Sequence, residues 1–179
     1  ISSSSYRVHK RLADAINLTN ALSDIYVRVK LHILGDLDTL TNESIKGVDK
    51  SRCIFYGKVD HQALPEFYRK ADLQLHLSIF DPCPNVVVEG LACGLPVVTP
   101  MESGAAELIG LENSKWAIEE NLAIKYYNLH EVSCVPRIPI HRYVSTVRNI
   151  VNDLSEQQIK ARQRAENVLD IRIAADQYK

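Results

Sequence analysis

The sequence predicts an α/β fold in which a doubly wound parallel sheet carries helices on both faces. The first observation is that segments typical of strands alternate with amphipathic segments typical of helices about five times along the chain. The second is that single glycines follow several of these segments, as at Gly35, Gly57 and Gly94, where a strand or a helix is expected to end. Two further helices are expected to close the chain.

The first third of the chain contains three predicted strands. Residues 1–5 are interpreted as the end of a strand, and residues 10–22 as a helix, because apolar side chains recur at helical spacing. Residues 26–34 alternate between polar and apolar side chains and are expected to form the second strand. A short helix over residues 41–49 and a strand over residues 53–56 follow.

The rest of the chain is expected to continue this alternation. The predicted elements are a helix over 64–70, a strand over 73–77, a loop over 78–84, a helix over 85–93, a strand over 95–99, short extended pieces within 123–129, and helices over 140–153 and 156–178. Asn85 is the expected N-cap and Gly94 the expected stop of the helix over 85–93. Ser103 or Gly104 is expected to begin another helix, and the spacing from Ser155 to Gln158 predicts a capping box.

Composition limits the classes of function. The chain has 179 residues, enough for one sizeable domain, and is 46% hydrophobic and 24% charged. A net charge of −1 gives no reason to expect nucleic acid or an anionic membrane as the main partner. No apolar run is long enough to span a bilayer. The four cysteines, Cys53, Cys83, Cys93 and Cys134, lack metal-binding spacing, which favours reduced thiols in a cytoplasmic protein; a Cys83–Cys93 disulfide stays open.

Four loops at predicted strand ends carry polar side chains that can bind a ligand. In a doubly wound sheet they meet at the carboxyl edge, where open α/β folds bind ligands. These loops are residues 5–11, 57–60, 81–89 and 99–104. Their cations, helix-start amides and carboxylates are together complementary to a phosphorylated ligand.

Two cations and two carboxylates stand out within these loops. Arg7 and Lys10 can neutralise a diphosphate, the first with a planar fork and the second as a point charge. Positive charge at a helix start opposes the helix dipole, so it favours a nearby anion over the alternative of two solvated side chains. Glu89 lies within an otherwise apolar helix, where an unpaired carboxylate is costly and a ligand diol would satisfy it. Asp81 is the second acid.

Missing motifs exclude several classes of site. The absence of GxGxxG argues against a nicotinamide enzyme, and the absence of GxxxxGK[ST] argues against a P-loop NTPase. No Ser-His-Asp or Cys-His spacing indicates a nucleophile, and no zinc site is expected. The Asp81 and Glu89 pair does not indicate a glycosidase, because sequence spacing cannot establish the carboxylate separation that such chemistry requires.

A series of short motifs resembles a known family. In order they are Arg7-Val-His-Lys-Arg-Leu12, Phe55-Tyr-Gly-Lys-Val59, Tyr68, Ala71-Asp72, Ser78, the acid-x7-Glu run from Asp81 to Glu89, Gly94-Leu-Pro-Val-Val98 and Ser103-Gly-Ala-Ala-Glu107-Leu-Ile. Their combination resembles the donor-binding half of the retaining GT-B glycosyltransferases often called group 1 or family 4. The resemblance implies a Rossmann-like domain over residues 1–179 that is one half of a GT-B architecture. An N-terminal acceptor domain is then expected to lie outside this chain.

The resemblance also implies roles for particular residues. Glu89 would bind the ribose hydroxyls of a nucleotide diphosphate sugar, and Asp81, where the family usually has glutamate, would contact hydroxyls of the donor sugar. Arg7 and Lys10 would hold the diphosphate, and these four side chains are the catalytic candidates. The remaining donor contacts would be the backbone amides of Asn85 and Val86 and the backbone near Val59.

The implied reaction transfers the sugar with retention and requires neither a metal nor another cofactor, with a UDP- or GDP-sugar as donor. The acceptor, a glycan, lipid or small molecule, and any membrane association would involve the missing half, so the isolated chain is expected to bind donor but turn over little or nothing. Two alternatives stay open at this point: a nucleotide-sugar epimerase of the same fold, and a non-catalytic nucleotide-binding module.

Overall fold

The computed structural model describes residues 1–120, 135–170, 172 and 173. Within this part of the chain, parallel strands form two three-stranded sheets, ordered β1-β2-β3 and β4-β5-β6. The strands are Ser2–Ser3 (β1), Leu31–Leu34 (β2), Cys53–Gly57 (β3), Gln74–Leu75 (β4), Val97–Pro100 (β5) and Ala117–Ile118 (β6).

Ile1 joins the two sheets along one edge. Its nitrogen donates to the Leu73 carbonyl at 2.8 Å, and the Leu75 amide donates to the Ile1 carbonyl at 2.8 Å. This is the bonding pattern of a parallel pair, so the strands follow the order β3-β2-β1-β4-β5-β6. That is the order of doubly wound dinucleotide-binding folds, which confirms the predicted α/β fold with a parallel sheet. The point where the strand order reverses lies between β1 and β4.

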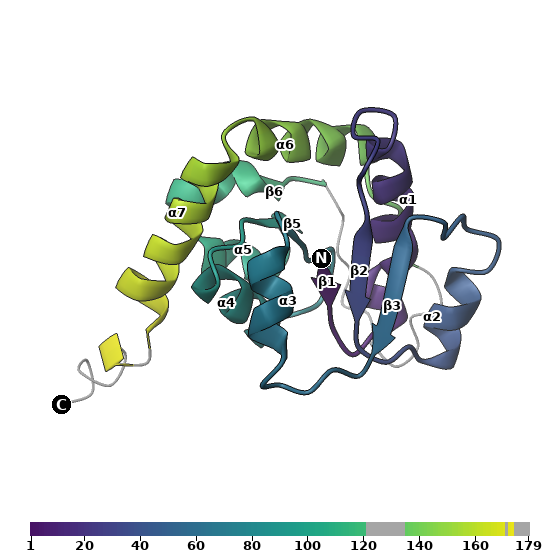
Figure 1. The fold of residues 1–179 in the computed structure, drawn as a ribbon, viewed down its shortest axis with the longest axis horizontal. Coiled ribbons are helices and arrows are strands. Elements are labelled where there is room, and N and C mark those ends of the chain that lie inside the picture. The colour runs from purple at the N-terminus through teal and green to yellow at the C-terminus, as the bar shows by residue number, and fades with distance from the viewer. Residues whose placement is uncertain (121–134, 171, 174–179) are drawn as a thin grey trace.

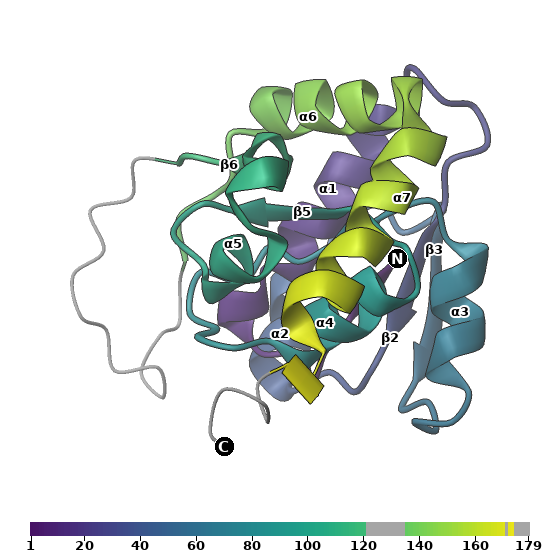
Figure 2. The same ribbon diagram turned by 90° about the vertical axis from the view of Figure 1, so that its left-hand side faces the viewer.

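Helices cover both faces of the sheet (Figures 1 and 2). Helix α1 packs against α2 and the crossing helix α6, whereas α4 packs against α3, α5 and α7. The helices are α1 (Leu12–Leu22), α2 (Thr39–Ser44), α3 (Leu64–Lys70), α4 (Asn85–Ala92), α5 (Gly104–Ile109), α6 (Ile140–Asn152) and α7 (Leu154–Arg164), with 3-10 turns η1 (Val8–Lys10) and η2 (Leu111–Trp116) and a π-helical turn η3 (Ala165–Leu169).

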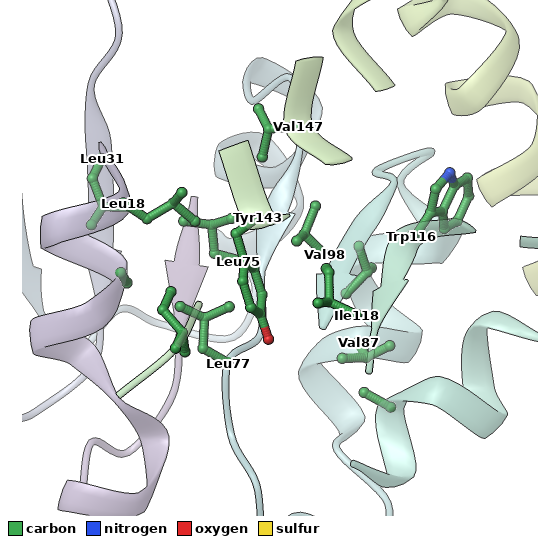
Figure 3. Close-up of a cluster of buried hydrophobic side chains, with 14 of the residues drawn as sticks. Leu18, Leu31, Leu75, Leu77, Val87, Val98, Trp116, Ile118, Tyr143 and Val147 are labelled. Carbon is green, nitrogen blue, oxygen red and sulfur yellow. The ribbon is translucent and has the colours of Figure 1, made fainter. Parts of the chain in front are cut away.

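The main core lies between the sheet and helices α1, α4 and α6. Figure 3 shows Tyr143 of α6 reaching in between Leu18 of α1 and Val98 of β5. Trp116 is fully buried, and its indole Nε1 donates to Gln157 Oε1 at 2.9 Å, which ties α7 to the domain. Within the described ranges, no helix combines the length and apolarity that a membrane-crossing segment requires.

The strand predicted over residues 26–34 is shorter than expected. It begins at Leu31, and the chain leaves α1 through turns in which the Tyr26 amide donates to the Leu22 carbonyl at 2.8 Å and the Val29 amide to the Tyr26 carbonyl at 3.1 Å. Val27 is 81% exposed. The alternating pattern misled the prediction because only its second half packs against neighbouring strands.

Two helix starts also differ from prediction. The helix predicted over 41–49 spans Thr39–Ser44 instead, because Asp38 caps it by accepting from the Thr41 amide at 2.7 Å. Pro84 rather than Asn85 is the N-cap of α4, and Asn85 is its first helical residue. Proline, which has no amide hydrogen and a fixed φ, suits a helix start without any side-chain capping bond.

Two predicted helix boundaries are confirmed. Gly94 follows α4 with a φ of +81°, in the left-handed region that glycine favours. Ser103 caps α5, its hydroxyl accepting from the Ala105 amide at 3.3 Å.

The last predicted helix, over 156–178, starts earlier than expected and is interrupted at Asp170, and its predicted end lies outside the described residues. Helix α7 begins at Leu154 after Asp153 with no side-chain capping bond, so the capping box at Ser155 does not form. The helix continues as η3 to Leu169, and Asp170 is extended (φ −67°, ψ 126°). The extended pieces predicted within 123–129 lie outside the described residues.

Candidate functional site

A cavity of about 370 Å³ opens between the loops that follow β1 and β4. It therefore lies where the strand order reverses, at the carboxyl edge of the sheet, which is where doubly wound folds bind ligands. Its lining residues are Ser4, Ser5, Arg7, His9, Lys10, Asp81, Cys83, Pro84, Asn85 and Val86. Most of the predicted site residues thus share one cavity, as the strand-edge rule predicts.

A tight turn presents the two cations to this cavity. The Lys10 amide donates to the Arg7 carbonyl at 2.8 Å, and the Arg11 amide donates to the Val8 carbonyl at 3.0 Å. Arg11 then adopts the left-handed conformation, with a φ of 55°, and ends the turn before α1 begins. Arg7 stays exposed at the mouth of the cavity, whereas Lys10 is turned inward.

Lys10 and Asp81, which are 71 positions apart in the sequence, form an ion pair across the cavity. The Lys10 ammonium contacts Asp81 Oδ2, and both side chains are less than a fifth exposed. His76, the residue that follows β4, lies near the same oxygen, with its Nε2 at 3.5 Å. Burial, reinforced by the Lys10 charge, lowers the pKa of His76 to about 4, so this ring is neutral at pH 7.

Gly104 fixes the backbone that carries Asp81. Its amide donates to the Asp81 carbonyl at 3.1 Å. A Cβ at this position would lie 2.1 Å from the Pro82 carbonyl oxygen and 2.6 Å from that of Asp81, so no larger residue fits without moving the loop. The loops after β4 and β5 are thereby held together.

Glu89 lies one helical turn beyond Asn85 and Val86 on α4, outside the cavity lining. Its Oε2 accepts from the Tyr68 hydroxyl at 3.2 Å, and His61 Nε2 is 3.8 Å from its Oε1. The side chain is 27% exposed. The expectation of a buried carboxylate without a protein partner is therefore wrong, because the α3 and α4 helices meet at Tyr68.

Tyr68 connects Glu89 to the sheet. Its hydroxyl also shares a 2.7 Å hydrogen bond with Ser3 Oγ of β1, and burial raises its pKa well above the usual range. Val59, the predicted contact to the base, packs its side chain against the cluster that contains Tyr68 and Leu95. Val59 and Glu89 therefore both lie next to Tyr68, and neither lines the cavity.

A buried polar cluster behind the turn had no counterpart in the sequence-based predictions. The Arg11 guanidinium binds both carboxylate oxygens of Glu120, at 2.9 and 2.7 Å, and the Tyr143 hydroxyl donates to the same carboxylate. The one local signal was a basic residue where the chain passes from the turn into an apolar helix. Its partner is 109 positions away, so no local pattern could have identified it.

Three cysteines are described, Cys53, Cys83 and Cys93, and all are free thiols, so the disulfide between the last two does not form. Cys134 lies outside the described residues. Among the residues that the structure describes, no three His, Cys, Asp or Glu side chains gather closely enough to hold a metal ion.

Residues 1–128 match the family model described as glycosyl transferases, group 1. An uncharacterized glycosyltransferase of Methanocaldococcus jannaschii is 32% identical over 73 residues, which are 40% of this chain and 19% of that protein. The chain therefore spans much less than two thirds of that relative.

Solved structures resemble the whole domain. A mutant of S. aureus TarM, solved with fondaparinux, α-GlcNAc-glycerol and UDP, superposes with a TM-score of 0.70 at 16% identity, over 99% of this chain and 34% of that one. Anabaena HepE, solved with UDP and glucose, superposes with a TM-score of 0.68 at 19% identity, over 99% of this chain and 46% of that one. WaaG, a glycosyltransferase of lipopolysaccharide biosynthesis, superposes with a TM-score of 0.70 at 20% identity, over 92% of this chain and 42% of that one. At these identities the likeness shows a shared fold, which each of these chains extends with further sequence.

Proposed function

The chain belongs to the group 1 glycosyl transferases, and we propose from this that it is the donor-binding domain of an enzyme that moves a sugar from a nucleotide diphosphate sugar to an acceptor with retention. The observation that carries the proposal is the cavity at the reversal of strand order, into which the turn after β1 brings Arg7 and Lys10. Two neighbouring structures were solved with UDP, which makes UDP-sugars the first donors to test.

Lys10 and Arg7 are proposed to hold the diphosphate. Lys10 is already inside the cavity. Its ammonium contacts Asp81, and the same ammonium can also donate to a phosphate oxygen of the ligand. Arg7 at the mouth is free to move toward the ligand because it is exposed. The backbone amides of Asn85 and Val86, in the first turn of α4, are proposed to add donors and a favourable helix dipole.

Glu89 and Val59 are proposed to receive the nucleoside. Glu89 is partly exposed, and among the described residues its Oε1 has only a distant histidine partner, so it can accept from ribose hydroxyls. The backbone of Val59, whose side chain packs against the cluster that contains Tyr68, is proposed to meet the base. Asp81 is proposed to contact hydroxyls of the donor sugar from the opposite wall.

The main chemical task of these groups is to stabilise charge on the departing nucleoside diphosphate. The Lys10 ammonium and the amides at the start of α4 are already in place at a partly buried cavity, and they are proposed to stabilise such charge more than water does, because they need no reorganisation as it develops. The proposal therefore requires no metal and no protein carboxylate as nucleophile. The acceptor site is assigned to a second domain outside this chain, so the isolated domain should bind donor with little or no turnover.

Ligand-dependent stability tests the proposal. Thermal unfolding is measured with UDP, GDP, ADP and their glucose derivatives, because a ligand at 100 times its Kd raises the unfolding free energy by about 2.7 kcal/mol. One nucleotide series should raise Tm by several degrees. Glu89→Ala should reduce that shift, whereas Glu66→Ala, which removes an exposed carboxylate that pairs with Lys70, serves as the matched control. Absence of any shift across the panel would overturn the donor-site proposal.

A further inference from the structure

The buried cluster of Arg11, Glu120 and Tyr143 lies directly behind the turn that presents Arg7 and Lys10. Arg11 follows Lys10 in the chain, and its guanidinium side chain and the Glu120 carboxylate are both almost completely buried, at 0% and 1% exposed. The Glu120 amide in turn donates to Glu102 Oε1 at 3.0 Å. The turn is thereby tied to the end of β6 and to α6.

The backbone of Arg11 is strained. It is the single non-glycine residue with a positive φ in the described part of the chain. The left-handed region disfavours residues with a Cβ by roughly 1–2 kcal/mol, and such strain persists where the surroundings over-determine the conformation. Here the surroundings are the bidentate ion pair with Glu120, which holds the side chain in one place.

The ion pair is poorly suited to stabilising the fold. Within the described residues, Arg11 Nε and Nη2 are buried without a hydrogen-bond partner, although Nη1 binds both oxygens of Glu120. Buried ion pairs of this kind contribute little or nothing compared with apolar residues of similar volume. Selection for stability alone would favour apolar residues in place of Arg11 and Glu120. The presence of this buried ion pair therefore indicates a role besides stability.

We propose, on the basis of the proposed function, that Arg11 is a positioning residue for the donor diphosphate. Through Glu120 and Tyr143 it locks the left-handed junction between η1 and α1. That junction sets the direction in which the Arg7–Lys10 turn leaves the sheet, and so places the Lys10 ammonium opposite Asp81. Arg11 itself touches no ligand, because its guanidinium points into the protein toward Glu120.

The test removes the cluster without leaving an unpaired charge. A triple variant, Arg11→Met, Glu120→Leu and Tyr143→Phe, replaces all three polar groups with apolar side chains of similar size. Its Tm should stay within a few degrees of wild type, while its Kd for UDP, measured by calorimetry, should rise about tenfold. In wild type, Lys10→Ala should also weaken UDP binding about tenfold, but in the triple variant the same change should have little further effect.

Two controls keep the outcomes distinct. Asp14 lies on α1, the helix that Arg11 precedes, and it pairs with the exposed residue Arg137. Arg137→Met removes this pair and should leave UDP affinity unchanged. Tyr143→Phe alone retains the ion pair between Arg11 and Glu120 and should raise the Kd for UDP about threefold. This single variant replaces the triple variant in the test if the triple variant does not fold.

The result that overturns the inference is a folded triple variant, or failing that a folded Tyr143→Phe variant, that binds UDP as wild type does. If the wild-type chain binds no nucleotide of the panel, the proposed function itself fails, and the positioning role fails with it. The two outcomes are distinguishable, because the positioning role is tested only when the wild-type chain binds UDP, whereas the proposed function fails when the wild-type chain binds no nucleotide.

Discussion

Gly104→Ala should displace the loop that carries Asp81. The new methyl carbon would lie 2.1 Å from the Pro82 carbonyl oxygen and 2.6 Å from that of Asp81. Because nonbonded carbon and oxygen atoms approach to roughly 3.4 Å, the loop must retreat by about 1 Å. Both contacts are to backbone atoms, so no side-chain rotation relieves them.

The expected effect on donor binding is larger than the effect on stability. Forcing a backbone apart in this way typically costs about 1–3 kcal/mol of unfolding free energy. A misplacement of about 1 Å can lower a reaction rate by about 100-fold, and we expect the weaker dependence of binding on geometry to raise the Kd for UDP-glucose by about tenfold. Calorimetry measures the binding, and urea denaturation measures the stability.

The matched control is Gly47→Ala, at a glycine with a φ of +73° whose Cβ position has no atom of the described residues within 4 Å. This variant should lose about 1 kcal/mol of stability through backbone strain and leave donor affinity unchanged. Gly104 does not position the Asp81 loop if Gly104→Ala binds UDP-glucose as tightly as wild type, or if Gly47→Ala weakens binding to the same degree.

Two further predictions concern buried rings near the cavity. Tyr68→Phe removes the hydroxyl that bonds Ser3 and Glu89, so the unfolding free energy measured by urea titration should fall by about 1–2 kcal/mol. The Kd for UDP should rise severalfold. An unchanged Kd would show that Glu89 needs no orienting partner. His76 has a pKa of about 4 when folded and near 6.5 when unfolded, so the unfolded chain binds more protons between these values and stability falls as pH drops through them. Wild type should therefore lose about 2 kcal/mol more than His76→Gln between pH 7 and pH 5, and equal losses would contradict the assignment.

Much of the fold could be predicted from sequence because its signals are local. Apolar strand segments, the left-handed Gly94 and the Ser103 cap all act over a few residues, and they appear where expected. The strand predicted from Tyr26 failed because alternation alone does not reveal which residues a neighbouring strand will cover. The start of the final helix was predicted two residues too late, because a capping-box spacing competes with other helix starts nearby.

The meeting of Lys10 and Asp81 was predictable from the rule that parallel strands end at one edge. Their direct ion pair was not, since side-chain placement depends on the exact turn geometry. The Tyr68–Glu89 bond and the Arg11–Glu120 pair join residues 21 and 109 positions apart. Such contacts leave no trace in local patterns, and they emerge only from the packed structure.

The seam that Ile1 forms with Leu73 and Leu75 also bears on how the domain folds. The seam joins residues 72 positions apart, and we expect such a non-local pairing to form slowly and late in folding. The cavity has walls on both sides of it and does not exist before it closes. A bound nucleotide should therefore slow unfolding without accelerating folding, and a chain caught before closure should be sensitive to proteases whether or not nucleotide is present.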